Sequence, residues 1–238
     1  MVAAWVGKHN GDTTGAGYVG HLKTYNTFGL NGAYAFGAIN KSIPNTTVQG
    51  WYYDVVDVAS AVWLQADAKV MGMVNVGAQY ATLDPSAAGA NDASIWAVKA
   101  AADVAGFNVY SAYSQADKDG GALSFANVST SDKTKIYTGD GSIYMDGIVT
   151  RAGADAFKIG ASTKMVPGVA LATSYCSASD VSVASHDISA WDISASGKIG
   201  ALGLTAIYTQ VANETDGASQ IYAGRDNDTL RLIATLAF

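Results

Sequence analysis

The last ten residues of the chain, TLRLIATLAF, alternate in polarity with the two-residue period of a β-strand. The apolar parity consists of Leu230, Leu232, Ala234, Leu236 and Phe238, whereas Thr229, Arg231 and Thr235 fall on the other parity. A strand with this pattern places its two faces in different surroundings. Because the sequence then stops on an aromatic residue, we expect the closing strand of an outer-membrane β-barrel, whose aromatic side chains lie at the membrane interface.

The same alternation recurs along the whole sequence. It predicts strands over residues 1–8, 30–38, 46–54, 62–70, 74–80, 96–104, 107–113, 157–165, 169–175, 191–199, 204–208 and 229–238. Short turns alternate with longer polar loops, as in barrels whose short turns face the periplasm. A soluble β-sandwich also alternates in polarity but has no reason to alternate long and short connections. We therefore expect an all-β fold, a transmembrane antiparallel β-barrel of about twelve strands forming one domain.

The composition excludes several classes of protein. Although 49% of the residues are hydrophobic, no run approaches the roughly 18 apolar residues of a transmembrane helix. The net charge of -6 argues against nucleic acid as a partner, because phosphate binding needs clustered Lys and Arg. Cys176 is the single cysteine, so an intramolecular disulfide is excluded.

In a barrel of this kind the apolar parity faces lipid and the polar parity faces the lumen. The charged residues expected to line a pore are Asp67, Lys69, Lys99, Asp103, Lys158, Lys164, Asp192, Lys198 and Arg231. The same parity carries Gln65, Asn75 and Gln79. Such a wall holds water rather than a packed core.

The longest irregular segment, residues 116–154, is the candidate pore constriction, because loops of about 40 residues are usually functional. Its charged residues are Asp117, Asp119, Asp132, Asp140, Asp146 and Arg151. An acidic excess at a constriction favours cations. The alternative is that these Asp residues are solvated turn formers, a common role of Asp.

Three segments carry a resemblance to a known family. They are residues 46–83, beginning TTVQGWYYD and including WLQADAK, the loop FANVSTSDKTKIYT and the hairpin KMVPGVALATSY. Together with the terminal strand they resemble the major outer membrane porins of campylobacters and their relatives, within the OprD-type porin superfamily. The resemblance implies a trimeric general-diffusion pore of about eighteen strands, with a long loop folded into the lumen. Since about twelve strands are predicted and no signal peptide precedes them, we expect a C-terminal fragment lacking the first strands.

The expected function is a porin of the bacterial outer membrane, a water-filled channel for passive diffusion of ions and small hydrophilic solutes with a weak cation preference. Its expected partners are outer-membrane lipid, those solutes and, by resemblance, two further copies in a homotrimer. Two alternatives remain open. The strand lysines and Arg231 favour an OprD-type substrate-specific channel for small carboxylate-bearing solutes, and a plugged lumen would make the barrel a non-conducting structural or adhesin protein.

Catalysis is not expected. The three histidines, His9, His21 and His186, lie in predicted loops or strand ends, and no G-x-S-x-G motif provides a nucleophile. The sequence has no H-E-x-x-H, CxxC, P-loop or EF-hand spacing. We therefore expect no enzyme activity, no cofactor and no metal site.

Overall fold

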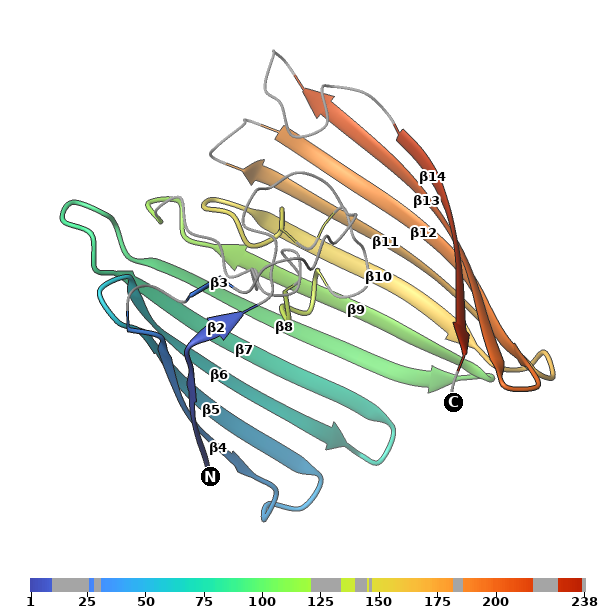
Figure 1. Cartoon of the computed structure of the whole chain (residues 1–238). Coiled ribbons are helices and arrows are strands. Elements are labelled where there is room, and N and C mark those ends of the chain that lie inside the picture. The colour runs from blue at the N-terminus through green and yellow to red at the C-terminus, as the bar shows by residue number, and fades with distance from the viewer. Residues whose placement is uncertain are drawn as a thin grey trace.

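The structure of the protein, a computed structural model, describes residues 1–9, 26–27, 31–120, 134–139, 145, 147–181, 186–215 and 227–236. Twelve strands form one antiparallel sheet in which neighbours follow chain order (Figure 1). They are β1 (Val2–Val6), β4 (Ala33–Asn40), β5 (Thr46–Val55), β6 (Ala59–Val70), β7 (Val74–Pro85), β8 (Ala93–Val104), β9 (Phe107–Ala116), β10 (Asp155–Thr163), β11 (Val169–Val181), β12 (His186–Ile199), β13 (Leu202–Thr215) and β14 (Asn227–Leu236). The all-β class and the twelve predicted strands are confirmed.

One small element was not predicted. The two-residue strands β2 (Lys8–His9) and β3 (Asn26–Thr27) pair with each other, and of their four residues only Lys8 falls within a predicted strand, that over residues 1–8. No helix in the described part of the chain is long and apolar enough to cross a membrane.

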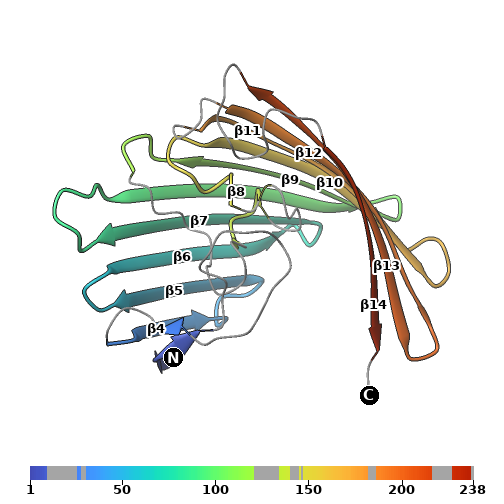
Figure 2. The same ribbon diagram turned by 45° about the horizontal axis from the view of Figure 1, so that its top comes forward.

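The sheet curves around an interior but does not close on itself. Strand β1 pairs only with β4, and β14 pairs only with β13. The two edge strands lie apart on opposite sides of the interior (Figures 1 and 2). The described residues therefore form a curved wall, and β14, which was expected to close the barrel, does not pair with β1 in it.

The connections at one end of the sheet are all short. They comprise residues 41–45, 71–73, 105–106, 164–168 and 200–201. Ala105 and Gly106 show why so few residues suffice, because their φ angles of 50° and 84° match the two positive values of a type I′ hairpin turn. The connections at the other end include the longer segments 86–92 and 117–154, but residues 56–58 form a connection of only three residues there. The predicted alternation of short turns and long loops is thus present only in part, because β5 and β6 are joined by a short connection at the loop end.

Polarity is inverted relative to a soluble protein. The convex outer face exposes large apolar side chains such as Leu64 (48%), Ile159 (52%) and Trp191 (47%). Buried polar side chains, including Gln79, Ser114 and Thr209, lie on the inner face instead. Apolar side chains of the irregular segment, among them Ile136 and Val149, pack against small residues of the inner wall. A sheet that exposes its apolar face suits a lipid environment.

Candidate pore and constriction site

The predicted pore-lining residues on strands all share the inner face. The pairing register places Asp67 opposite Gly77 and Gly77 opposite Lys99, so the three residues form a row across β6, β7 and β8. The row continues through Ala112 to Lys158 and Cys176. Further rows on the same face carry Lys69, Asp103, Asp192, Lys198 and Arg231. Lys164 is the exception, because β10 ends at Thr163 and Lys164 lies in the following turn.

The centre of the site is a contact between this row and the irregular segment. Lys99 Nζ lies 2.6 Å from Asp67 Oδ1, and it also sits 4.1 Å from the ring centroid of Tyr137, a cation–π geometry. The Tyr137 hydroxyl donates a 2.9 Å hydrogen bond to Asp67 Oδ1. Burial and the neighbouring Asp67 carboxylate raise the pKa of Tyr137 far above its usual value, so its hydroxyl keeps the proton that it donates.

Gly77 makes room for this contact. A Cβ atom at position 77 would lie 2.5 Å from the Tyr137 hydroxyl oxygen, 2.7 Å from Asp67 Oδ1 and 2.8 Å from Lys99 Cε. These distances are shorter than van der Waals contact. Only glycine therefore allows the tyrosine hydroxyl to reach the ion pair between the two neighbouring strands.

Gln79 fixes the backbone of the same segment. Its side-chain Nε2 donates to the carbonyl of Lys135 at 2.9 Å, and its Oε1 accepts from the backbone N–H of Tyr137 at 3.1 Å. Gln79 also donates to Gln65 Oε1 at 3.1 Å, and Gln65 in turn donates to Asp67 Oδ2 at 2.6 Å. An amide side chain with both a donor and an acceptor suits this pairing with a peptide backbone.

Two further strands hold the segment from the other side. Residues 134–139 are called the inner segment below. The hydroxyls of Ser114 on β9 and Thr138 lie 2.6 Å apart, and Cys176 Sγ on β11 donates to the Thr138 carbonyl at 3.2 Å. The Tyr110 hydroxyl donates to the Tyr137 carbonyl. Side chains from β6, β7, β9 and β11 thus bind one inner segment.

The base of the long loop is tied to the strand ends. The N–H of Ala116 donates to the Ala154 carbonyl at 2.8 Å, and the N–H of Gly153 donates to the Asp117 carbonyl at 2.9 Å. The carboxylate of Asp117 accepts from the N–H of Asp119 at 3.1 Å, which is the local turn role of Asp. Neither Asp117 nor Asp119 reaches the row at Asp67. Arg151 is half-buried in the loop, and Asp132, Asp140 and Asp146 lie outside the described residues.

The other predicted wall residues lie apart from this contact. Asp192 is buried and accepts a hydrogen bond from the Thr209 hydroxyl. Arg231 Nε and Nη2 are buried without a hydrogen-bond partner among the described residues, and Lys158 is only 6% exposed. Asp103 and Lys164 line an inner hollow of about 460 Å³ floored by Ser162, Ser194 and Ser196. Lys164 and Lys198 line an adjoining hollow of about 530 Å³.

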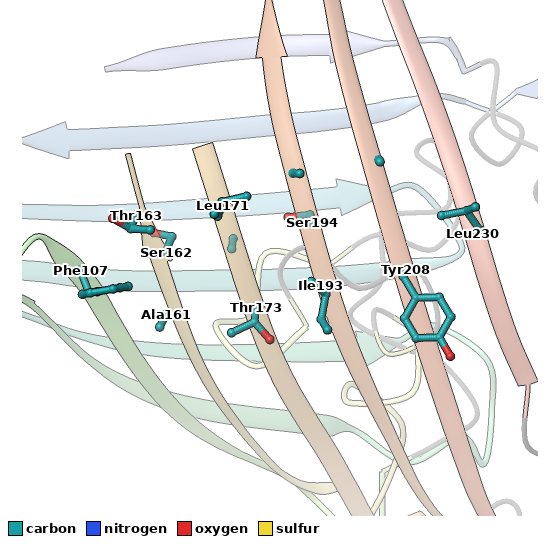
Figure 3. A pocket seen from close by; sticks show the side chains of 13 residues that line it. Phe107, Ala161, Ser162, Thr163, Leu171, Thr173, Ile193, Ser194, Tyr208 and Leu230 are labelled. Carbon is teal, nitrogen blue, oxygen red and sulfur yellow. The ribbon is translucent and has the colours of Figure 1, made fainter. Parts of the chain in front are cut away.

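The outer face has an apolar hollow of its own. It measures about 420 Å³ and crosses β9 to β14, with Phe107, Leu171, Ile193, Tyr208 and Leu230 around it (Figure 3). Residues of the outward parity dominate its lining, so it opens away from the polar wall. This hollow is therefore not part of the candidate pore.

Several residues of the site escaped the sequence analysis. Tyr137, Tyr110 and Gly77 had no predicted role, and Gln65 and Gln79 were placed only on the polar parity. The signal available for Gly77 was a glycine at an inward position between two strands with charged inward residues. No comparable signal existed for Tyr137, because an irregular segment has no periodicity that indicates what it contacts.

Comparisons with known proteins show what fold the chain shares. Neither a protein-family model nor a curated protein sequence matches it. Solved structures do. OccAB2 of Acinetobacter baumannii matches with a TM-score of 0.71 and 17% identity over 98% of this chain and 62% of that one. OccK3 (OpdO) of Pseudomonas aeruginosa matches with a TM-score of 0.70 and 10% identity, covering 90% and 57%.

OprD of Pseudomonas aeruginosa matches with a TM-score of 0.65 and 13% identity, over 86% of this chain and 60% of that one. At these identities the likeness is one of fold. OprD also gives its name to the superfamily that the sequence segments resemble. The chain spans about three-fifths of the length of these structures.

Proposed function

We propose that the chain forms the wall of an outer-membrane channel for passive diffusion of ions and small hydrophilic solutes. One observation carries the proposal: the curved sheet exposes apolar side chains outward and directs charged and amide side chains inward. A wall of this polarity separates lipid from water. The OprD-like fold supports the same function, because such a fold leaves an aqueous path through the membrane.

The inner segment is the proposed constriction. It lies against the inner wall and occupies space that the strands would otherwise leave to water, and its hydrogen bonds come from four different strands. A segment held at several points narrows a channel by a fixed amount. The narrowest section of a pore sets its size limit and its charge preference.

The acidic residues of the long loop are the basis for a weak cation preference in this proposal. The second candidate, a channel selective for small carboxylates, is favoured by the balance of charge on the described inner wall. On the strands of that wall five cations face three carboxylates, namely Lys69, Lys99, Lys158, Lys198 and Arg231 against Asp67, Asp103 and Asp192. The Lys99–Asp67 ion pair cancels one charge of each sign, which leaves four cations and two carboxylates.

Kinship with the major porins of campylobacters and assembly into a homotrimer are parts of the same proposal. They are supported by the resemblance of residues 46–83 and of the two later segments, and not by any contact of the described residues.

Planar-bilayer recording under a salt gradient tests the function. The refolded protein is expected to give discrete conductance steps with a cation-directed reversal potential. An anion-directed reversal would replace the cation preference with the carboxylate channel. A folded, β-rich and membrane-inserted protein that gives no steps would overturn conduction by this chain and leave an unclosed sheet or the structural or adhesin barrel.

A further inference from the structure

The short turns at one end of the sheet are unexpectedly apolar. These turns, residues 41–45, 71–73, 105–106, 164–168 and 200–201, are called the turn rim below, and they lie along one edge of the molecule (Figure 1). The rim contains no Asp or Glu. Met71 and Met73 at its tips are 86% and 66% exposed, and Met165 and Ile43 are 63% and 52% exposed. Turns that face water are ordinarily built from polar residues.

The outward aromatic residues mark a level on the wall. On β4 to β13, each described outward Tyr or Trp lies six or eight residues from the turn end of its strand, as from Tyr80 to Val74 or from Trp96 to Val104. These residues are Tyr34, Tyr52, Tyr80, Trp96, Tyr113, Tyr175, Trp191 and Tyr208. Tyr and Trp at a constant level are typical of a membrane interface.

The distance from this level of outward Tyr and Trp residues to the turn ends of the strands is shorter than the apolar thickness of a membrane. At about 3.3 Å per residue and a tilt of about 40°, six to eight residues rise only about 15–20 Å. The apolar band of a barrel is about 25 Å tall. A further 5–10 Å or so of apolar surface is therefore required below the strand ends, and the described outer face offers no second belt of Tyr or Trp there. The tips of the turn rim supply this missing surface.

We infer that the turn rim is embedded in the lipid leaflet at its end of the barrel, with Met71, Met73 and Ile43 among the acyl chains. Lys41, which is exposed in the first turn, then reaches the headgroup phosphates while its stem stays in the apolar layer. The lack of carboxylates suits a surface against anionic headgroups. The loop end differs, because Asp57, Asp84, Asp92, Asp117 and Asp119 lie there.

This inference rests on the proposed membrane placement, and the test separates the two. Single cysteines replace Met73, Ile43, Val98 and Ala88 in a Cys176→Ala background, and each carries an environment-sensitive fluorophore in phospholipid vesicles. Val98 is an outward residue within the apolar band, and Ala88 is exposed in a connection at the loop end. Brominated phospholipid reports contact with acyl chains, and aqueous iodide reports contact with water.

The expected result is a blue-shifted emission and a loss of intensity with brominated lipid at positions 73, 43 and 98, with iodide quenching at position 88. Iodide quenching at both rim positions, combined with lipid quenching at position 98, overturns the embedded rim and leaves the membrane placement intact. It would instead indicate a rim open to water or to a partner protein. Iodide quenching at position 98 in addition to both rim positions overturns the membrane placement and the rim inference together.

Discussion

The contact between Tyr137 and Asp67 makes a quantitative prediction about how firmly the inner segment is held. Tyr137→Phe removes the hydroxyl that donates to Asp67 Oδ1 at 2.9 Å but keeps the ring under Lys99 Nζ. A hydrogen bond to a charged group contributes about 1.5–3 kcal/mol. Asp67 retains Lys99 and Gln65 as partners in the variant. We therefore expect a loss at or below the lower end of that range, about 1–2 kcal/mol.

Cys176 reports this loss directly. Its side chain is 1% exposed, and its Sγ donates to the carbonyl of Thr138 in the inner segment. A thiol reagent reaches it only when the segment opens, because a buried thiol is unreactive. A loss of about 1–2 kcal/mol raises the open population, and hence the labelling rate, by about 5- to 30-fold.

The assay measures the rate of maleimide labelling of folded protein in detergent, with Thr173→Val as a control for a hydroxyl lost from the outer face. Thr173 accepts a hydrogen bond from Trp191 at 2.8 Å, far from the inner segment. The control is expected to label at the parent rate. Equal labelling rates for the parent and Tyr137→Phe would refute the reasoning, because the tyrosine hydroxyl would then not hold the segment.

Three further predictions address the same wall. Gly77→Ala is expected to raise the Cys176 labelling rate, because its Cβ would lie 2.5 Å from the Tyr137 hydroxyl oxygen. Gly203→Ala, whose Cβ meets nothing closer than 3.6 Å, is expected to leave the rate unchanged. Equal labelling rates for both variants would contradict the conclusion that only glycine at position 77 makes room for Tyr137. Lys99→Met is expected to lower the free energy of unfolding in denaturant by about 1–3 kcal/mol, since it leaves a partly buried carboxylate without its cation. Adding Asp67→Asn should recover part of that loss, and fully additive losses would mean that the two residues are uncoupled. Arg231→Gln is expected to move the reversal potential toward cations, and an unchanged potential would show that Arg231 does not face the conducting path.

The strands and their faces were predictable from the sequence because a two-residue period states both where a strand runs and which side chains share a face. This is why the predicted wall residues on strands lie on one face. Lys164 falls in a turn because Thr163 is the last residue paired with β9 and β11. The two-residue strands β2 and β3 were missed, since so short a pair carries no period.

The contacts within the site were not predictable. Tyr137 and Asp67 are 70 positions apart in the sequence, and their contact depends on where an irregular segment meets the wall. The pairing of Asp67 with Lys99 depends on the register of β6, β7 and β8, which the alternation alone leaves open by steps of two residues. The sequence likewise does not show that β1 and β14 remain apart.

The central claim is that the outer face of the sheet contacts lipid and the inner face contacts water. Cysteines placed one at a time at Leu64, Gln65, Ala66 and Asp67 in a Cys176→Ala background of the membrane-inserted protein test it most directly. A charged, water-soluble thiol reagent is expected to label positions 65 and 67 and to leave positions 64 and 66 unlabelled. Labelling at 64 and 66 with protection at 65 and 67 would contradict the account, because it would place the apolar face in water.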